Sequence, residues 1–228
     1  MSPQLTSLVA ANIAFVGGHF VLSHPFRAGL VASLGERGFL AAYSVVQIAV
    51  FAWIVIAFRA VGAGGAPLWN GQSDTLWVIA SLMTILALAL LFGSLRSNPA
   101  LPATTPETVE IAKPYGAFAI TRHPMMWGIA IWAFAHILVA PTVRTLITAG
   151  SMAVLALLGA HLQDRKKEVL LGQAWNGWES RTTFSPRLRH LGALGFTTWT
   201  MAAIAWLLAT WAHIPLAWVP AGIWRWVG

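Results

Sequence analysis

The sequence predicts an all-α integral membrane protein, a helical bundle with about six transmembrane helices in a single domain. Of its 228 residues, 57% are hydrophobic and only 9% are charged, and the mean hydropathy is +0.69. A soluble domain carries about 25% charged residues, so this chain has too few charges to cover a soluble surface. Because we find no internal repeat and no low-complexity linker, we expect one transmembrane domain over residues 1–228.

Six apolar segments are long enough to cross the hydrocarbon core, which takes about 20 residues of helix. They lie at residues 5–22, 39–60, 76–95, 117–140, 146–162 and 194–211. No basic residue precedes the first segment, so we expect a membrane helix there and not a cleaved signal peptide. Residues 214–227 are rich in Trp and Pro, which is typical of an anchor at the membrane interface.

The basic residues predict the orientation of the chain. The loops after the first, third and fifth segments hold eleven of the fourteen: Arg27, Arg37, Arg96, Lys113, Arg122, Arg165, Lys166, Lys167, Arg181, Arg187 and Arg189. The positive-inside rule places these loops in the cytoplasm. We therefore expect a multi-pass protein of a bacterial inner membrane with both termini in the periplasm. The net charge of +7 then reflects contact with anionic membrane lipids, and nucleic acid is not an expected partner.

The fifth loop is predicted to form a structured cytoplasmic cap over about residues 163–190. Its apolar residues include Leu171, Trp175 and Trp178, which are spaced i, i+4, i+7 as on one face of an amphipathic helix. Val169 and Leu170 add to this apolar content. The adjacent Asp164 and Arg165 are placed to pair with the TRHP segment at residues 121–124. A solvated run of charges is the alternative.

Two histidines, His19 and His136, lie deepest within predicted spans, where ionisable groups are costly and are functional candidates by default. His19 follows Gly17 and Gly18, and two glycines allow a planar group or another backbone to approach closely. A hydrogen bond to a neighbouring helix is the alternative explanation for His19. His136 shares one helix face with Gly128 and Trp132, at the spacing i, i+4, i+8. We expect Gly18, Gly128 and Trp132 to help bind a cofactor.

Arg122 and His123 stand at the entrance of the fourth span, where Pro124 suits the first turn of a helix. They are either interface anchors or catalytic residues together with His136. Of the other histidines, we expect His24 to be solvated at a loop edge, and we expect no special role for the three that remain. These are His161, His190 and His213.

The chain has no cysteine, which excludes disulfides, Cys-based metal sites and covalent c-type haem attachment. Two imidazoles on different apolar helices suit a bis-histidine haem, with His19 and His136 as the metal ligands. His136 lies thirteen residues beyond His123, or roughly 20 Å along a helix. His19 and His136 match in depth only if the fourth helix begins well outside the membrane. Otherwise His123 is the better partner for His19.

Three blocks carry a family resemblance: GGHFVLSHPFRAGLVASLGERGFLAAYSVV, ITRHPMMWGIAIWAFAHILVA and DRKKEVLLGQAWNGWESRTTFSP. In these blocks the chain resembles the NnrU family, which includes the 15-cis-ζ-carotene isomerases. The resemblance implies a haem b enzyme whose axial ligands are His136 and His19, with His24 as a rival to His19. It also implies a redox-gated cis–trans isomerisation of the central double bond, an electron donor for the haem, and a carotenoid that enters from the bilayer.

Two other functions remain open from the sequence. The family name is associated with denitrification, so a haem-based nitric oxide sensor or a denitrification accessory protein is one alternative. The RHPMMWG motif also resembles the membrane methyltransferases that modify isoprenylcysteine or phospholipids. In those enzymes the Arg-His-Pro segment and a downstream Glu help hold S-adenosylmethionine. Glu168 and Glu179 lie downstream here, but the adjacent Glu-Glu pair of that family is missing.

Overall fold

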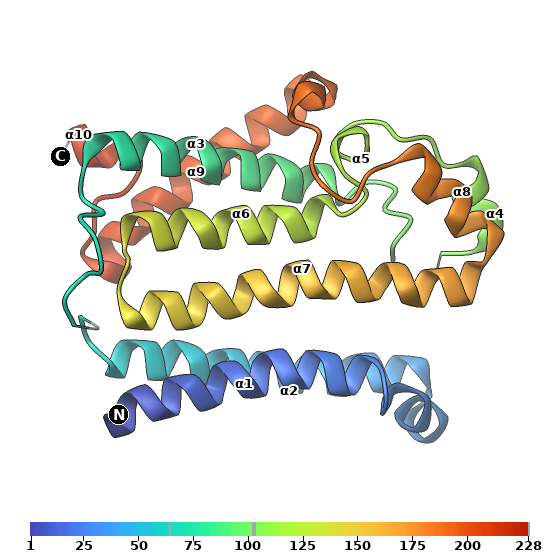
Figure 1. The fold of residues 1–228 in the computed structure, drawn as a ribbon, viewed down its shortest axis with the longest axis horizontal. Coiled ribbons are helices and arrows are strands. Elements are labelled where there is room, and N and C mark those ends of the chain that lie inside the picture. Colours follow the sequence, from blue (N-terminus) through green and yellow to red (C-terminus); the bar gives the residue numbers. More distant parts are fainter. Residues whose placement is uncertain (64, 102–103, 228) are drawn as a thin grey trace.

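All the regular secondary structure in the described part of the chain is helical, which confirms the predicted fold class. The computed structural model describes residues 1–63, 65–101 and 104–227 (Figure 1). The long helices are α1 (Pro3–Ser23), α2 (Arg27–Ala60), α3 (Asp74–Gly93), α6 (Pro124–Val139), α7 (Val143–Leu171) and α9 (Phe196–Ala217). The short ones are α4 (Pro106–Ile111), α5 (Ala117–Ile120), α8 (Gln173–Arg181), the 3₁₀ helix η1 (Leu188–Ala193) and α10 (Trp224–Val227).

The fourth predicted span is shorter than the sequence suggested. Within the described residues, five helices are long and apolar enough to cross a membrane, and α6 has only 16 residues. At 1.5 Å per residue α6 is about 24 Å long, against about 30 Å of hydrocarbon. The prediction that this helix begins at Ala117 was wrong because Pro124 disfavours helical geometry in the residue before it. His123 accordingly has φ −122° and ψ 57°, and α6 begins at Pro124.

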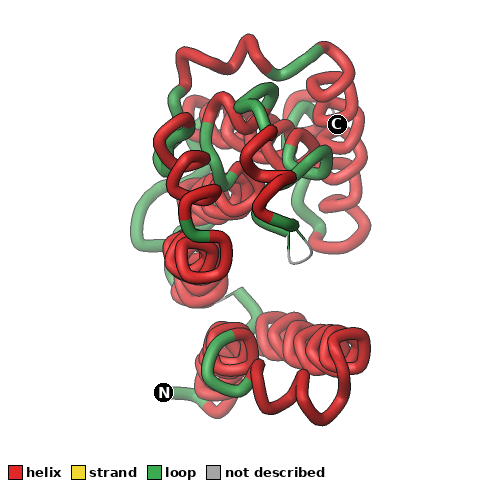
Figure 2. The backbone as a smooth tube through the Cα atoms, turned by 90° about the vertical axis from the view of Figure 1, so that its right-hand side faces the viewer, coloured by secondary structure: helices red, strands yellow, loops and turns green. Residues whose placement is uncertain are grey.

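The long helices form two groups that α7 joins. The helices α1 and α2 make an antiparallel pair, and α7 packs between α1 and α6. On the other side of α6, α3 packs against both α6 and α9. Figure 2 shows the α1–α2 pair beside the larger group. An apolar cluster at the junction contains Leu8, Ala11, Ala133, Ala149 and Ala153, and these small side chains allow the helices to approach closely.

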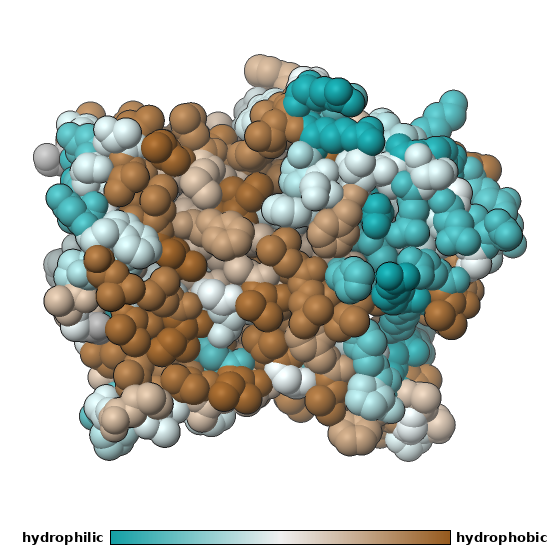
Figure 3. Space-filling model, viewed as in Figure 1, coloured by the Kyte–Doolittle hydropathy of each residue, from teal (hydrophilic) through white to brown (hydrophobic). Residues whose placement is uncertain are grey.

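The bundle has two chemically different ends. The start of α1 and the short α10 lie together at one end, which we name the termini end (Figure 1). The opposite end, which we name the polar end, holds α4, α5 and α8, and hydrophilic residues gather there (Figure 3). Between the two ends the surface is mainly hydrophobic. Ile13, Val45 and Ile56, for example, are each 67% exposed, as is expected of side chains that face lipid.

The helix α2 is kinked where the sequence reads LGER. Gly35 has φ 71° and ψ 166° inside this helix, a backbone conformation that a residue with a Cβ adopts only under strain. The first two turns of α2 therefore bend away from its long membrane part. Arg27 in the bent turns forms an ion pair with Glu36 at 2.6 Å, across the kink.

Candidate functional site

A buried charged cluster lies at the polar end, where α6 begins beside α7. The carboxylate of Asp164 accepts hydrogen bonds from Arg122 Nε at 2.8 Å and Arg122 Nη2 at 2.6 Å. Its other oxygen lies 2.7 Å from His123 Nε2. The side chains of Arg122, His123 and Asp164 are only 14%, 1% and 5% exposed. The predicted pairing of Asp164 with the TRHP segment is therefore present, whereas Arg165 pairs with Glu168 at 3.2 Å.

The extended segment before α6 positions this charged cluster. Thr121 has φ −155° and ψ 151°, and its hydroxyl donates to the Phe184 carbonyl at 2.6 Å. The backbone N–H of Arg122 donates to the Thr183 carbonyl at 2.8 Å. Trp127, one turn into α6, donates from Nε1 to the same Phe184 carbonyl at 2.8 Å. The chain that follows α8 thus holds the residues that lead into α6.

Glu179 of α8 completes the charged cluster. Its carboxylate lies 3.0 Å from Arg122 Nη2. Burial raises the pKa of Glu179, and repulsion from Asp164 and Glu168 adds to this effect, while the attraction of Arg122 opposes it. The contact between Glu179 and Arg122 was not predicted from the sequence, although both residues belong to the segments that resemble membrane methyltransferases.

A small cavity opens beside the charged cluster. It has a volume of about 100 Å³ and is lined by Ala100, Leu101, Arg122, His123, Met125 and Met126, among other residues. The lining thus combines polar side chains, among them Arg122 and His123, with apolar ones. A cavity of this size holds a few water molecules or a small chemical group.

Several residues of the predicted cap belong to a buried apolar cluster at the polar end. Trp175 and Trp178 of α8 are 0% and 1% exposed, and Leu171 packs against the same apolar cluster. The i, i+4, i+7 face therefore exists, although Gly172 interrupts the helix between α7 and α8 with φ 52°. Val169 and Leu170 are 86% and 62% exposed and do not contribute to this cluster.

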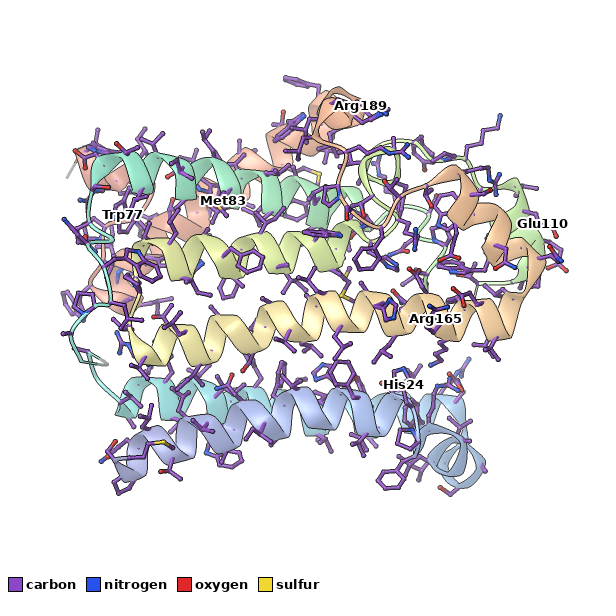
Figure 4. All side chains as sticks on the ribbon, in the orientation of Figure 1. His24, Trp77, Met83, Glu110, Arg165 and Arg189 are labelled. Carbon is purple, nitrogen blue, oxygen red and sulfur yellow. The ribbon has the colours of Figure 1, made fainter. Side chains whose placement is uncertain are left out.

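The predicted cap packs against a short helix that was not predicted from the sequence. The short helix α4 packs on α8, and its Val109 is fully buried against the two tryptophans. Figure 4 shows Glu110 of α4 and Arg165 of α7 at the polar end, while Trp77 lies at the termini end.

His136 lies at the opposite end of α6, in its last turn. Its Nδ1 atom is 2.8 Å from the Trp132 carbonyl oxygen, and the Trp132 ring lies against the imidazole with 4.3 Å between ring centroids. Beyond His136 stands His213 of α9, at 6.2 Å between ring centroids. No special role was predicted for His213.

His19 occupies a similar local environment on a different helix. Its Nδ1 is 2.8 Å from the Phe15 carbonyl oxygen, and its ring is 4.5 Å from the Phe15 ring and 5.7 Å from that of Tyr43. His19 lies in the last two turns of α1, toward the polar end. Because α1 and α6 run in opposite directions, His19 and His136 lie toward opposite ends of the bundle (Figure 1).

The structure therefore does not bring the two predicted haem ligands together. Axial ligands of one iron must face each other across the porphyrin. His19 and His136 are separated along the bundle axis, and α7 packs between their helices. Each imidazole taken alone fits a haem ligand, but the two do not fit as a pair within one chain. His123 is not the partner of His19 either, because its Nε2 contacts Asp164.

The predicted roles of two glycines also need correction. A Cβ atom at Gly128 would lie 2.7 Å from the Ala87 carbonyl oxygen, so this glycine allows close packing of α6 on α3. A Cβ at Gly18 would lie 2.9 Å from Gln47 Nε2, so the space before Gly18 is filled by α2. Neither glycine faces space for a cofactor. Gly17, in contrast, lines an open groove of about 560 Å³ between α1 and α7.

Comparison with known proteins supports the resemblance seen in the sequence. The family model described as NnrU protein matches residues 7–221. No curated protein and no solved structure matches the chain. The family match covers α1 from residue 7, the other five long helices, the charged cluster at the polar end, and both His136 and His213. The chain therefore belongs to the NnrU family.

Proposed function

We propose that this NnrU protein is a membrane isomerase that acts on the central 15-cis double bond of a carotenoid of the ζ-carotene type, with haem b as cofactor. The observation that carries the proposal is the setting of His136. Its ring lies on an apolar helix beside Trp132, and its Nδ1 is committed to a backbone carbonyl. A carbonyl oxygen accepts hydrogen bonds, so Nδ1 carries the proton and Nε2 keeps its lone pair for a ligand.

The surroundings of His136 suit a lipophilic substrate. Trp132 and Phe134 on the same helix are 38% and 43% exposed, so aromatic surface faces the bilayer near the imidazole. A conjugated polyene is insoluble in water and would reach this surface from the lipid, where flat aromatic rings can pack against it. Haem bound through His136 would supply a redox-active iron, which an electron donor must reduce.

Arg122 and His123 act in this proposal as positioning residues. They lie at the start of α6, and His136 lies thirteen residues further on, about 20 Å along the helix. Their bonds to Asp164 of α7 fix where α6 begins. They hold the helix that carries His136 and do not reach a substrate beside it.

The proposal is tested in cells that accumulate 15-cis-ζ-carotene. Expression of the wild-type protein is expected to convert the 15-cis isomer to the trans isomer at that bond, as measured by chromatography of the extracted carotenoids. His136→Ala should abolish the conversion, whereas the control His190→Ala, a change in the peripheral η1, should not. Purified wild-type protein with a Soret band but without conversion would refute the isomerase and favour the nitric oxide-related role.

A second candidate function rests on the polar end. The Arg-His-Pro arginine and a downstream glutamate meet there, with Arg122 Nη2 3.0 Å from Glu179, beside the cavity that His123 lines. This contact is the observation that favours an S-adenosylmethionine-dependent methyltransferase. Isothermal titration of the purified protein with S-adenosylmethionine tests it. Saturable binding that Glu179→Gln weakens, in a protein without a Soret band, would support the methyltransferase over the isomerase.

A further inference from the structure

Two imidazoles from different helices stand next to each other near the termini end. The rings of His136 and His213 have their centroids 6.2 Å apart and an angle of 32° between their planes. Both helices run from the polar end toward the termini end, and both pack against α3. Trp206, two turns before His213 on α9, donates from Nε1 to Thr84 of α3 at 3.0 Å, which holds α9 in place.

The hydrogen bonds of the two histidines fix their tautomers. His136 Nδ1 lies 2.8 Å from the Trp132 carbonyl oxygen, and His213 Nδ1 lies 2.7 Å from the Ala209 carbonyl oxygen. In both cases the carbonyl accepts, so Nδ1 is the protonated nitrogen. Each Nε2 then has a free lone pair. A ligating histidine in a metal site usually has this arrangement, with its other nitrogen donating to a backbone carbonyl or a carboxylate.

The separation of the rings matches a pair that shares one metal ion. A bond from a metal to an imidazole nitrogen is about 2 Å, so two nitrogens on opposite sides of the ion are about 4 Å apart. Each ring centre lies roughly 1 Å behind its nitrogen, which gives about 6 Å between the centroids. The observed 6.2 Å agrees with this value.

The two Nε2 atoms are open to a ligand. Neither forms a hydrogen bond within the described residues. Two neutral rings with the same tautomer also have no proton to share between their Nε2 atoms. A metal centre between the rings satisfies both lone pairs at once.

We infer that His136 and His213 are the two imidazole ligands of one metal centre, and that haem iron is the metal they hold. This inference rests on the haem role proposed above for His136. His213 takes the place that was predicted for His19, because the His213 ring lies next to the His136 ring. His19 is then free of iron, beside Phe15 and Tyr43.

The test is the spin state of the ferric haem in the purified protein. Wild type should give the low-spin electron paramagnetic resonance spectrum of two imidazole ligands. His213→Ala should convert the iron to the high-spin form or lower haem occupancy about tenfold or more. Imidazole added to His213→Gly should restore the low-spin spectrum. His19→Ala is the matched control and should keep it. A low-spin spectrum that survives His213→Ala and is lost in His19→Ala would overturn the inference.

A second measurement does not depend on haem. Because the chain has no cysteine, two can be introduced and spin-labelled without background. The pair His136→Cys and His213→Cys should give a shorter spin–spin distance than the pair His19→Cys and His136→Cys. The reverse order would overturn the inference even in a protein that carries no haem. If the His213 variants behave as expected but no carotenoid is converted, the isomerase proposal fails and the ligand pair stands.

Discussion

Replacing Asp164 by asparagine probes the charged cluster at the polar end. The substitution keeps the shape of the side chain and removes its charge. Asp164 accepts two hydrogen bonds from Arg122, and its other oxygen contacts His123 Nε2. The amide oxygen can still accept from Arg122, and the NH₂ group would face His123 Nε2. The charge that compensates the Arg122 guanidinium is lost, however, in a site where the Asp164 side chain is only 5% exposed.

The expected loss of stability follows from the burial of the partners. Breaking a buried ion pair by removing one partner costs about 3–5 kcal/mol, because the remaining charge is left uncompensated. Glu179 stays 3.0 Å from Arg122 and offsets part of that cost. We therefore expect Asp164→Asn to lower the free energy of unfolding by about 3 kcal/mol. For a chain of 150–250 residues this corresponds to a fall in Tm of about 6–12 °C.

The assay is a thermal scan of the detergent-purified protein, followed by the fluorescence of its 13 tryptophans. Glu168→Gln is the matched control, since it makes the same chemical change in an exposed pair. The side chains of Arg165 and Glu168 are 65% and 30% exposed, so this pair contributes about 0.5 kcal/mol or less. If Asp164→Asn shifts Tm no further than Glu168→Gln, the charged cluster does not stabilise the fold.

Three further outcomes are expected. Gly128→Ala should lower Tm, because the added Cβ would lie 2.7 Å from the Ala87 carbonyl oxygen. At the control position Gly150 an added Cβ has nothing within 4 Å, so Gly150→Ala should leave Tm unchanged or raise it. Equal changes in Tm would contradict the close packing of α6 on α3. Because the pKa of Glu179 is raised above 4.5, ionisation of this group costs stability as pH rises through the folded-state pKa. Wild type should therefore gain in Tm relative to Glu179→Gln as the pH is lowered from 7 to 4.5, and a constant difference would speak against it. A phosphatase fused after the last residue should be active in the periplasm, and a cytoplasmic signal would reverse the predicted orientation.

The helices were predictable because their signals are local. Apolar segments of sufficient length gave all six long helices. Asp164 was placed near the TRHP segment from its charge and from the prediction that the third and fifth loops share one side of the membrane. The face formed by Leu171, Trp175 and Trp178 was also visible in the spacing. The break before α6 was not predicted, although Pro124 carried the signal, since apolar residues continue on both sides of it.

The partners of individual side chains were less predictable. Small residues that let membrane helices pack occur on several faces of each helix, so the sequence alone does not say which helices meet. The pairing of His136 with His213 depends on both α6 and α9 packing on α3, and the only local sign was a histidine inside an apolar segment. The contact of α4 with α8 had a weaker signal still, in the single apolar face around Val109.

The arrangement in which α7 joins the two helix groups has a consequence for biosynthesis. The α1–α2 hairpin emerges first, but the α7 residues that pack on it, such as Ala149 and Ala153, follow about 90 residues after the end of α2. At 5–20 residues per second, the ribosome takes roughly 5–20 s to deliver them. During that interval, the surface of the hairpin that will later pack against α7 contacts only lipid or the insertion machinery. Release of nascent chains that end before α7 should therefore leave a membrane-inserted hairpin that cellular quality control can recognise as an orphan.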